Sequence, residues 1–256
     1  MTDIRDPVAP VNKSPSLFHR FANPGAFYRV ARPCLSYFAG LGLTLLAVGL
    51  CDGLFFSPAD WQQGESVRIM YLHVPMAWLG SACYAALAVC GVLSLVWRHP
   101  LADIAALEIG PVGACATALC LITGSLWGKP TWGTWWVWDA RLTSMLILFF
   151  LYLGHITLMR AFDDPNRGQK AAAILALIGA VDLPIIKFSV KWWNTLHQPA
   201  SLTLTNVPTI SMNILLPLLL CTLGFTLCAI ALIGTRMCAC INERRFQRLL
   251  NQEIAP

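Results

Sequence analysis

The chain is 256 residues long, 57% of them apolar and only 12% charged, with a net charge of +5. About a quarter of the residues of a soluble globular protein are charged, so this composition excludes a soluble domain and indicates a membrane protein with several spans. The small positive excess bears on orientation in the membrane and gives no indication of nucleic-acid binding.

Six apolar segments are long enough to cross about 30 Å of hydrocarbon as helices. A polar, basic segment at residues 1–34 precedes them, and it shows no pattern of a cleaved signal peptide. The expected spans are residues 35–56, 74–97, 107–126, 142–159, 171–190 and 210–233. Beyond this 35–235 domain, residues 236–256 form a basic tail that we expect to be helical. The sequence therefore predicts an all-α integral membrane protein with six transmembrane helices.

Lysine and arginine are unevenly distributed between the two ends of this predicted bundle. An even number of spans puts both termini on one side. Thirteen of the eighteen lysines and arginines fall in the segments on that side, which the positive-inside rule places in the cytoplasm. In a bacterium the opposite face, with the loop between the third and fourth spans, is then periplasmic.

That loop, residues 125–143, is unusually rich in tryptophan. It holds half of the chain's ten tryptophans, namely Trp127, Trp132, Trp135, Trp136 and Trp138. Two glycines and Pro130 are expected to interrupt a regular helix here, and the charges of Lys129, Asp139 and Arg141 place the loop at the membrane surface. One interpretation is an aromatic belt at the headgroup level. The other is a platform for a large, flat, apolar ligand, because indole rings offer rigid apolar area and an N–H donor.

Two of the five histidines, His73 and His197, share the predicted outer face with this loop. Taken singly, each is more typical of a surface or packing residue than of a ligand. His73 lies at the expected start of the second span, and a helix N-terminus favours the neutral imidazole that a metal needs. Two such imidazoles suit the iron of a porphyrin, whereas zinc normally takes three or four ligands. The outer cations either anchor the chain at the interface or bind the porphyrin carboxylates; they include Arg68, Lys129, Arg141 and Lys191.

The polar residues within the spans are few. Asp182 lies about midway along the fifth span, and an intramembrane carboxylate is a functional candidate by default; one interpretation is a protonated group bonded to a neighbouring helix. We interpret His155, in the fourth span, as a helix–helix contact. The ten cysteines avoid the outer loops, which argues against a disulfide framework, and the chain lacks the C-x-x-C-H motif of c-type haem attachment.

Three segments resemble a known family of membrane proteins. Residues 127–143 resemble the tryptophan-rich WWD signature of haem-handling proteins. Residues 68–75 and 192–198, with the six-span length, narrow the resemblance to the haem exporter protein C family of system I cytochrome c maturation. The resemblance covers residues 32–236. The WWD signature alone does not separate this family from its larger relatives, which have more spans and further histidines.

The resemblance implies a protein that is not an enzyme and binds haem b (iron protoporphyrin IX) as a transferred ligand at the periplasmic face of the inner membrane. His73 and His197 occupy the positions of the family's axial ligands. The five tryptophans of the loop complete the candidate site, together with Asp139, Arg141, Arg68 and Lys129. Implied partners are a periplasmic haem chaperone, the membrane and ATPase subunits of an ABC transporter, a small single-span subunit and membrane lipid.

Two other hypotheses remain open. One is a permease subunit that moves haem or another solute through the helix bundle, with Asp182 on the path. The other is a scaffold that binds partner proteins and no ligand. Asp182 stands where we expect an uncharged polar residue from the resemblance.

Overall fold

The structure, a computed structural model, describes residues 23–193, 195–197 and 210–254, which are almost entirely helical. The main helices are α2 (Pro24–Cys51), α3 (Met70–Trp97), α4 (Pro100–Trp132), α5 (Ala140–Leu158), α6 (Pro165–Gly179), α7 (Asp182–Trp192) and α8 (Met212–Ile254). A π-helical turn, η1 (Asp52–Phe56), continues α2, and a 3-10 helix, η2 (Glu65–Ile69), leads into α3. Within these described residues, six helical segments are long and apolar enough to cross a membrane. The predicted six-span, all-α architecture is therefore confirmed.

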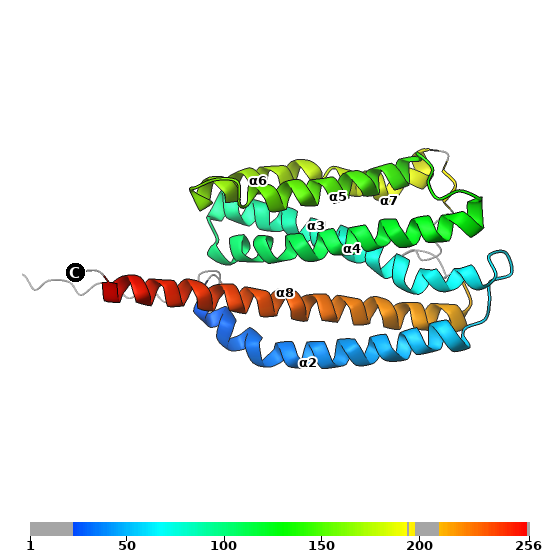
Figure 1. Ribbon diagram of the computed structural model, residues 1–256, viewed down its shortest axis with the longest axis horizontal. Helices are drawn as coiled ribbons and strands as arrows, with labels where there is room; N and C mark the ends of the chain where they lie inside the picture. The colour runs from blue at the N-terminus through cyan, green and yellow to red at the C-terminus, as the bar shows by residue number, and fades with distance from the viewer. Residues whose placement is uncertain (1–22, 194, 198–209, 255–256) are drawn as a thin grey trace, which may run out of the picture.

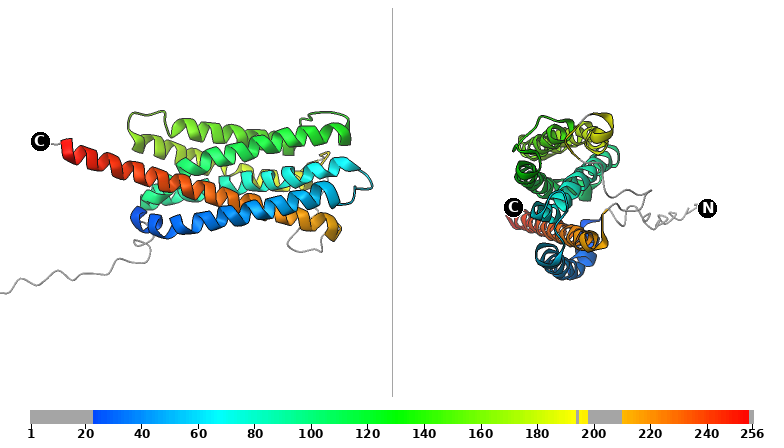
Figure 2. Two further views of the ribbon diagram at one scale, coloured as in Figure 1. Left: turned by 60° about the horizontal axis from the view of Figure 1, so that its bottom comes forward. Right: turned by 90° about the vertical axis from the view of Figure 1, so that its right-hand side faces the viewer.

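The helices run roughly along one long axis (Figure 1). α2 begins and α8 ends at the same end of the bundle, as an even number of spans requires. At the opposite end α4 ends and α5 begins; we call this the tryptophan end, because residues 127–138 lie there. Viewed end-on, α2 lies at one side of the bundle. It is followed by α8, then by α3 and α4, and finally by α5, α6 and α7 at the other side (Figure 2).

The first and last spans form a pair of their own, in which α2 packs mainly on α8. Gly42 and Gly49 of α2 face Cys228 and Cys221 of α8, and a Cβ at Gly42 would lie only 2.8 Å from the Cys228 sulfur. Helices in lipid gain little from the hydrophobic effect against each other, so close packing of small side chains holds such pairs together. These two cysteines are therefore packing residues, as the sequence indicated.

Buried side chains also join neighbouring helices by hydrogen bonds. Tyr152 of α5 donates to the carbonyl of Gly80 in α3 at 2.6 Å. His155 contacts the carbonyl of Ala172 in α6 through Nδ1 at 3.2 Å, which confirms its predicted helix–helix role. Such bonds add stability because an unpaired polar group inside a membrane is costly.

α4 continues through the first half of the predicted 125–143 loop and ends at Trp132, so the expected interruption at Gly128 and Pro130 is wrong. Pro130 lies in the last turn, where it removes a single backbone hydrogen bond. The Thr131 hydroxyl donates to the carbonyl of Trp127 at 2.8 Å and helps to close that turn. The helix stops instead at Gly133, whose φ of 78° is left-handed and unstrained for glycine.

The predicted fifth span is also not continuous, because it is divided into α6 and α7 at residues 180 and 181. Pro184 explains the break, since it has no N–H to bond to the carbonyl of Ala180. Asp182 becomes the first residue of α7 and is buried, and its Oδ2 has no hydrogen-bond partner in the described part of the chain. The bond to a neighbouring helix suggested for this carboxyl is not found for that oxygen.

The outer limits of the helical region are wider than predicted. α2 begins at Pro24, where the Asn23 side chain caps it by accepting from the Gly25 N–H at 2.8 Å, so part of the 1–34 segment is helical. Residues 1–22 lie outside the described residues. α8 continues to Ile254, which confirms a helical tail over the described residues beyond 235. α3 begins at Met70, four residues before the expected span, and thereby includes His73 in its first turn.

Candidate functional site

His73 is held against α4 at the tryptophan end. Its Nδ1 lies 3.0 Å from the carbonyl oxygen of Cys120 and 3.1 Å from Oγ1 of Thr123. The Thr123 hydroxyl already donates to the carbonyl of Leu119 at 2.6 Å, so it faces His73 as an acceptor. We therefore assign the imidazole proton to Nδ1, which leaves the lone pair on Nε2. No hydrogen bond in the described residues engages that Nε2.

The ring of His73 also packs directly on the backbone of α4. A Cβ built at Gly124 would lie 2.9 Å from Cε1 of His73. Carbon atoms in good contact are about 3.5–4.0 Å apart, so no larger residue fits at this position without movement. The absence of a side chain at Gly124 lets α3 and α4 approach closely enough for the His73 hydrogen bonds to form.

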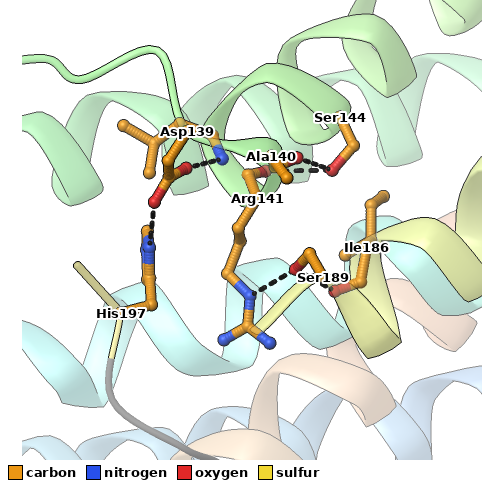
Figure 3. Close-up of polar contacts among 8 residues, drawn as sticks. Asp139, Ala140, Arg141, Ser144, Ile186, Ser189 and His197 are labelled. Atoms are coloured by element: carbon orange, nitrogen blue, oxygen red, sulfur yellow. Dashed lines mark hydrogen bonds and ion pairs between the residues drawn. The ribbon is translucent and has the colours of Figure 1, made fainter. Parts of the chain in front are cut away.

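His197 is held at the same end by Asp139, whose Oδ2 lies 3.1 Å from Nδ1 of the ring (Figure 3). The other carboxylate oxygen accepts the N–H of Leu142 at 2.8 Å and caps α5. Burial lowers the pKa of His197 below its usual value near 6.5, and the bond to Asp139 opposes the shift. His197 is thus neutral at pH 7, with its proton on Nδ1 and its Nε2 without a hydrogen bond in the described residues.

Each histidine forms a T-shaped contact with one tryptophan ring of α4. The ring centroids of His73 and Trp127 are 5.6 Å apart, and those of His197 and Trp132 are 4.9 Å apart, both in edge-to-face arrangements. The indole N–H of Trp127 donates to Oε1 of Gln63 at 2.8 Å, which fixes the ring. The continued helix therefore positions two tryptophans beside the two imidazoles.

The remaining three tryptophans lie in the segment between α4 and α5. Trp135 and Trp138 are exposed, and Trp138 packs edge-to-face on Trp136 with centroids 5.4 Å apart. The Trp136 indole N–H is buried and has no hydrogen-bond partner among the described residues. A cleft of about 300 Å³ opens between Trp132 and the turn at residues 60–64. That volume is at the lower end of the range of small-molecule pockets.

Arg141 is the candidate cation that the structure places beside the histidines. Its Nε donates to Oγ of Ser189 in α7 at 3.3 Å, and the terminal guanidinium nitrogens point away from α5 (Figure 3). Arg141 follows Asp139, the partner of His197, by two residues. His73 and His197 both pack on tryptophans of the same helix, α4. Three segments far apart in the sequence thus contribute to one site.

Two of the other candidate cations, Arg68 and Lys129, have contacts of their own. Arg68 pairs with Glu65 and donates through Nη1 to the carbonyls of Gly53 and Leu54 at the end of η1. Lys129 donates to the carbonyl of Gly133 at 3.0 Å and lies over the Trp135 ring. Both interactions stabilise helix ends, those of η1 and α4.

Four contributors to the site were not anticipated from the sequence: Cys120, Thr123, Ser189 and Gln63. Thr123 precedes Trp127 by four residues, so both lie on one face of a helix. That signal was hidden because the helix was expected to end before Trp127. Within the described residues, no group of three His, Cys, Asp or Glu side chains is placed to hold a metal ion.

Comparison with known proteins shows the family of this chain. The family model for heme exporter protein C matches residues 17–252. The chain is 49% identical to heme exporter protein C of Bradyrhizobium diazoefficiens, over 89% of this chain and 86% of that protein. It is 53% identical to heme exporter protein C of Haemophilus influenzae, over 81% of this chain and 84% of that protein. A putative cytochrome c biosynthesis mitochondrial protein of Marchantia polymorpha is 45% identical over 72% of this chain and 76% of that protein. The chain therefore belongs to the heme exporter protein C family, multi-pass membrane proteins that handle haem for cytochrome c maturation.

Proposed function

We propose that this protein binds haem b at the tryptophan end through His73 and His197 and delivers it to a periplasmic haem chaperone. The observation that carries the proposal is shared by both imidazoles. Each is fixed through Nδ1 by an acceptor on a different segment, and each leaves Nε2 without a hydrogen bond in the described chain. Histidines that ligate metals are typically held in this way by their second nitrogen.

The surroundings of the two imidazoles suit a porphyrin. Trp127 and Trp132 provide rigid apolar surface beside each ligand. Two histidines without a third protein ligand match the iron of haem, whose other four positions are filled by the porphyrin itself. The tryptophans at 135, 136 and 138 extend the apolar surface towards the lipid headgroups.

Arg141 is the best placed residue to bind a haem propionate. A guanidinium group pairs with carboxylates through two parallel hydrogen bonds. Because Ser189 holds Nε, the terminal nitrogens remain directed away from α5 (Figure 3). Arg68 and Lys129 contribute less in this proposal, since the structure engages them with backbone carbonyls.

The predicted orientation supports an inner-membrane protein whose tryptophan end is periplasmic. The distribution of lysine and arginine favours this sidedness. Relatives of the chain are named heme exporter protein C, which supports a role in haem export. We therefore propose that the chain works beside the membrane and ATPase subunits of an ABC transporter, with a small single-span subunit and the chaperone as further partners.

A second candidate function, a permease subunit, is favoured by one observation. The fifth span is broken at residues 180–181 next to buried Asp182, and broken helices with polar groups mark the binding sites of many transporters. Transport by the reconstituted chain alone, slowed in Asp182→Asn, would support this function. Absence of transport together with stable haem binding would exclude it.

Absorption spectroscopy of the purified protein tests the main proposal. The wild type is expected to carry haem with the spectrum of two-histidine ligation. The double variant His73→Ala/His197→Ala should lose this haem, while His99→Ala, at the opposite end of the bundle, should retain it. Equal haem content in the double variant and the wild type would refute the proposal.

A further inference from the structure

The two histidines are held by acceptors that differ in charge. His73 donates from Nδ1 to a backbone carbonyl and a hydroxyl, both neutral. His197 donates from Nδ1 to Asp139, a carboxylate whose side chain is only 5% exposed. Hydrogen bonds to an ionised acceptor are roughly twice as strong as those between neutral groups. The two rings are therefore not equivalent, although both present Nε2.

This difference determines how strongly each Nε2 donates its lone pair. A carboxylate draws the Nδ1 proton towards itself and increases the electron density of the ring, so it raises the basicity of Nε2. A carbonyl and a hydroxyl have the same effect to a smaller extent. The structure thus provides one strong and one weaker nitrogen donor at a single site.

We propose that His197, positioned by Asp139, is the retained axial ligand and that His73 is the ligand released first when haem is handed on. The inference rests on the proposed haem-binding function. The step is a ligand substitution without change of oxidation state. The bond between iron and Nε2 of His73 breaks, the lone pair stays on the imidazole, and a neutral donor of the accepting protein forms the new bond.

Asp139 is a positioning residue in this scheme, and it also joins His197 to the start of α5. One oxygen holds the ring and the other caps the helix that carries Arg141, two residues further on (Figure 3). Asparagine is as good a helix cap as aspartate, so Asp139→Asn retains the cap and removes the charge. Its amide also offers a donor to Nδ1, which favours the wrong tautomer of His197. In a serine protease triad, replacing the aspartate by asparagine likewise favours the wrong histidine tautomer and strongly lowers kcat.

Haem transfer from single-histidine variants to excess apomyoglobin measures the strength of each remaining bond. His73→Ala leaves His197 as the ligand and should release haem at least about tenfold more slowly than His197→Ala. Adding Asp139→Asn should accelerate release from His73→Ala by about 10- to 100-fold and change release from His197→Ala little. Asp164→Asn is the matched control, because Asp164 caps α6 by accepting from the Asn166 N–H and lies outside the site.

A spectroscopic measurement separates electronic from merely structural effects. In the ferrous state, the iron–histidine stretching frequency should be higher in His73→Ala than in His197→Ala, and Asp139→Asn should lower it only in the former. Equal release rates or equal frequencies in the two variants, complete haem loss from both, or faster release from His73→Ala would overturn the inference. A wild type that binds no haem would instead refute the proposed function.

Discussion

Gly124→Ala adds one methyl group directly against the ring of His73. The new Cβ would lie 2.9 Å from Cε1 of His73, whereas carbon atoms in good contact are about 3.5–4.0 Å apart. The ring or the two helices must therefore move by roughly 0.6–1.1 Å. The ring is not free to swing away, because two acceptors on α4 hold its Nδ1. We expect the substitution to displace the imidazole of His73 without removing any of its atoms.

The size of the effect follows from two opposing contributions. An added methyl group in a packed interior typically costs about 1–3 kcal/mol, while replacing glycine by alanine inside a helix gains up to about 1 kcal/mol. If displacement of His73 relieves most of this strain in the haem-free protein, the unfolding transition should change by about 1 kcal/mol or less. Returning His73 to its position for haem binding would then cost about 1–3 kcal/mol, which corresponds to a roughly 5- to 150-fold loss of haem affinity.

Haem titration and thermal unfolding of the same preparations measure the two effects separately. Gly40→Ala is the matched control, because Gly40 lies in a helix and a Cβ there meets nothing within 4 Å. That control should retain wild-type affinity. If Gly124→Ala binds haem as tightly as Gly40→Ala, the position of His73 against α4 is not part of the haem site and the reasoning is refuted.

Three further substitutions test the roles assigned from the structure. Arg68→Ala removes donors to two carbonyls at the end of η1 and should lower the free energy of unfolding by about 1–3 kcal/mol with haem affinity unchanged; a parallel loss of affinity would show that Arg68 binds haem directly. Trp127→Phe keeps a ring beside His73 but loses the bond to Gln63, so denaturation should show a cost of about 1 kcal/mol, and no cost would mean that this bond does not order the ring. Asp182→Asn should leave haem release unchanged and raise the thermal midpoint, because the amide removes an ionisable group from the membrane interior; faster haem release would show that Asp182 takes part in haem binding.

Much of the architecture followed from composition and periodicity. Long apolar runs are unambiguous when each must cross the bilayer, so the number and class of the spans were predictable. The ends of the helices were less predictable. Gly128 and Pro130 predicted an interruption of the helix. A proline in the last turn costs little, however, and α4 continues to Trp132. The opposite error occurred in the fifth span, where Pro184 breaks a helix that hydropathy alone treats as continuous.

The candidate ligands could be chosen from the sequence, whereas the groups that orient them could not. Topology placed His73 and His197 on one face with the tryptophans, and in the structure each packs on a tryptophan of α4. The acceptors that orient the rings were hidden, because a backbone carbonyl such as that of Cys120 has no sequence signature. Asp139 was recognised as a candidate, but its bond to His197 joins residues 58 positions apart and depends on how α5 and the end of α7 meet.

The central claim is that one haem iron is bound by imidazoles from two distant segments of the chain. Electron paramagnetic resonance of the ferric, haem-loaded protein tests it most directly. The wild type is expected to give a low-spin signal of two-histidine ligation, and His73→Ala and His197→Ala should each convert it to a signal of single-histidine ligation. A wild-type signal that survives both single substitutions unchanged would contradict the account.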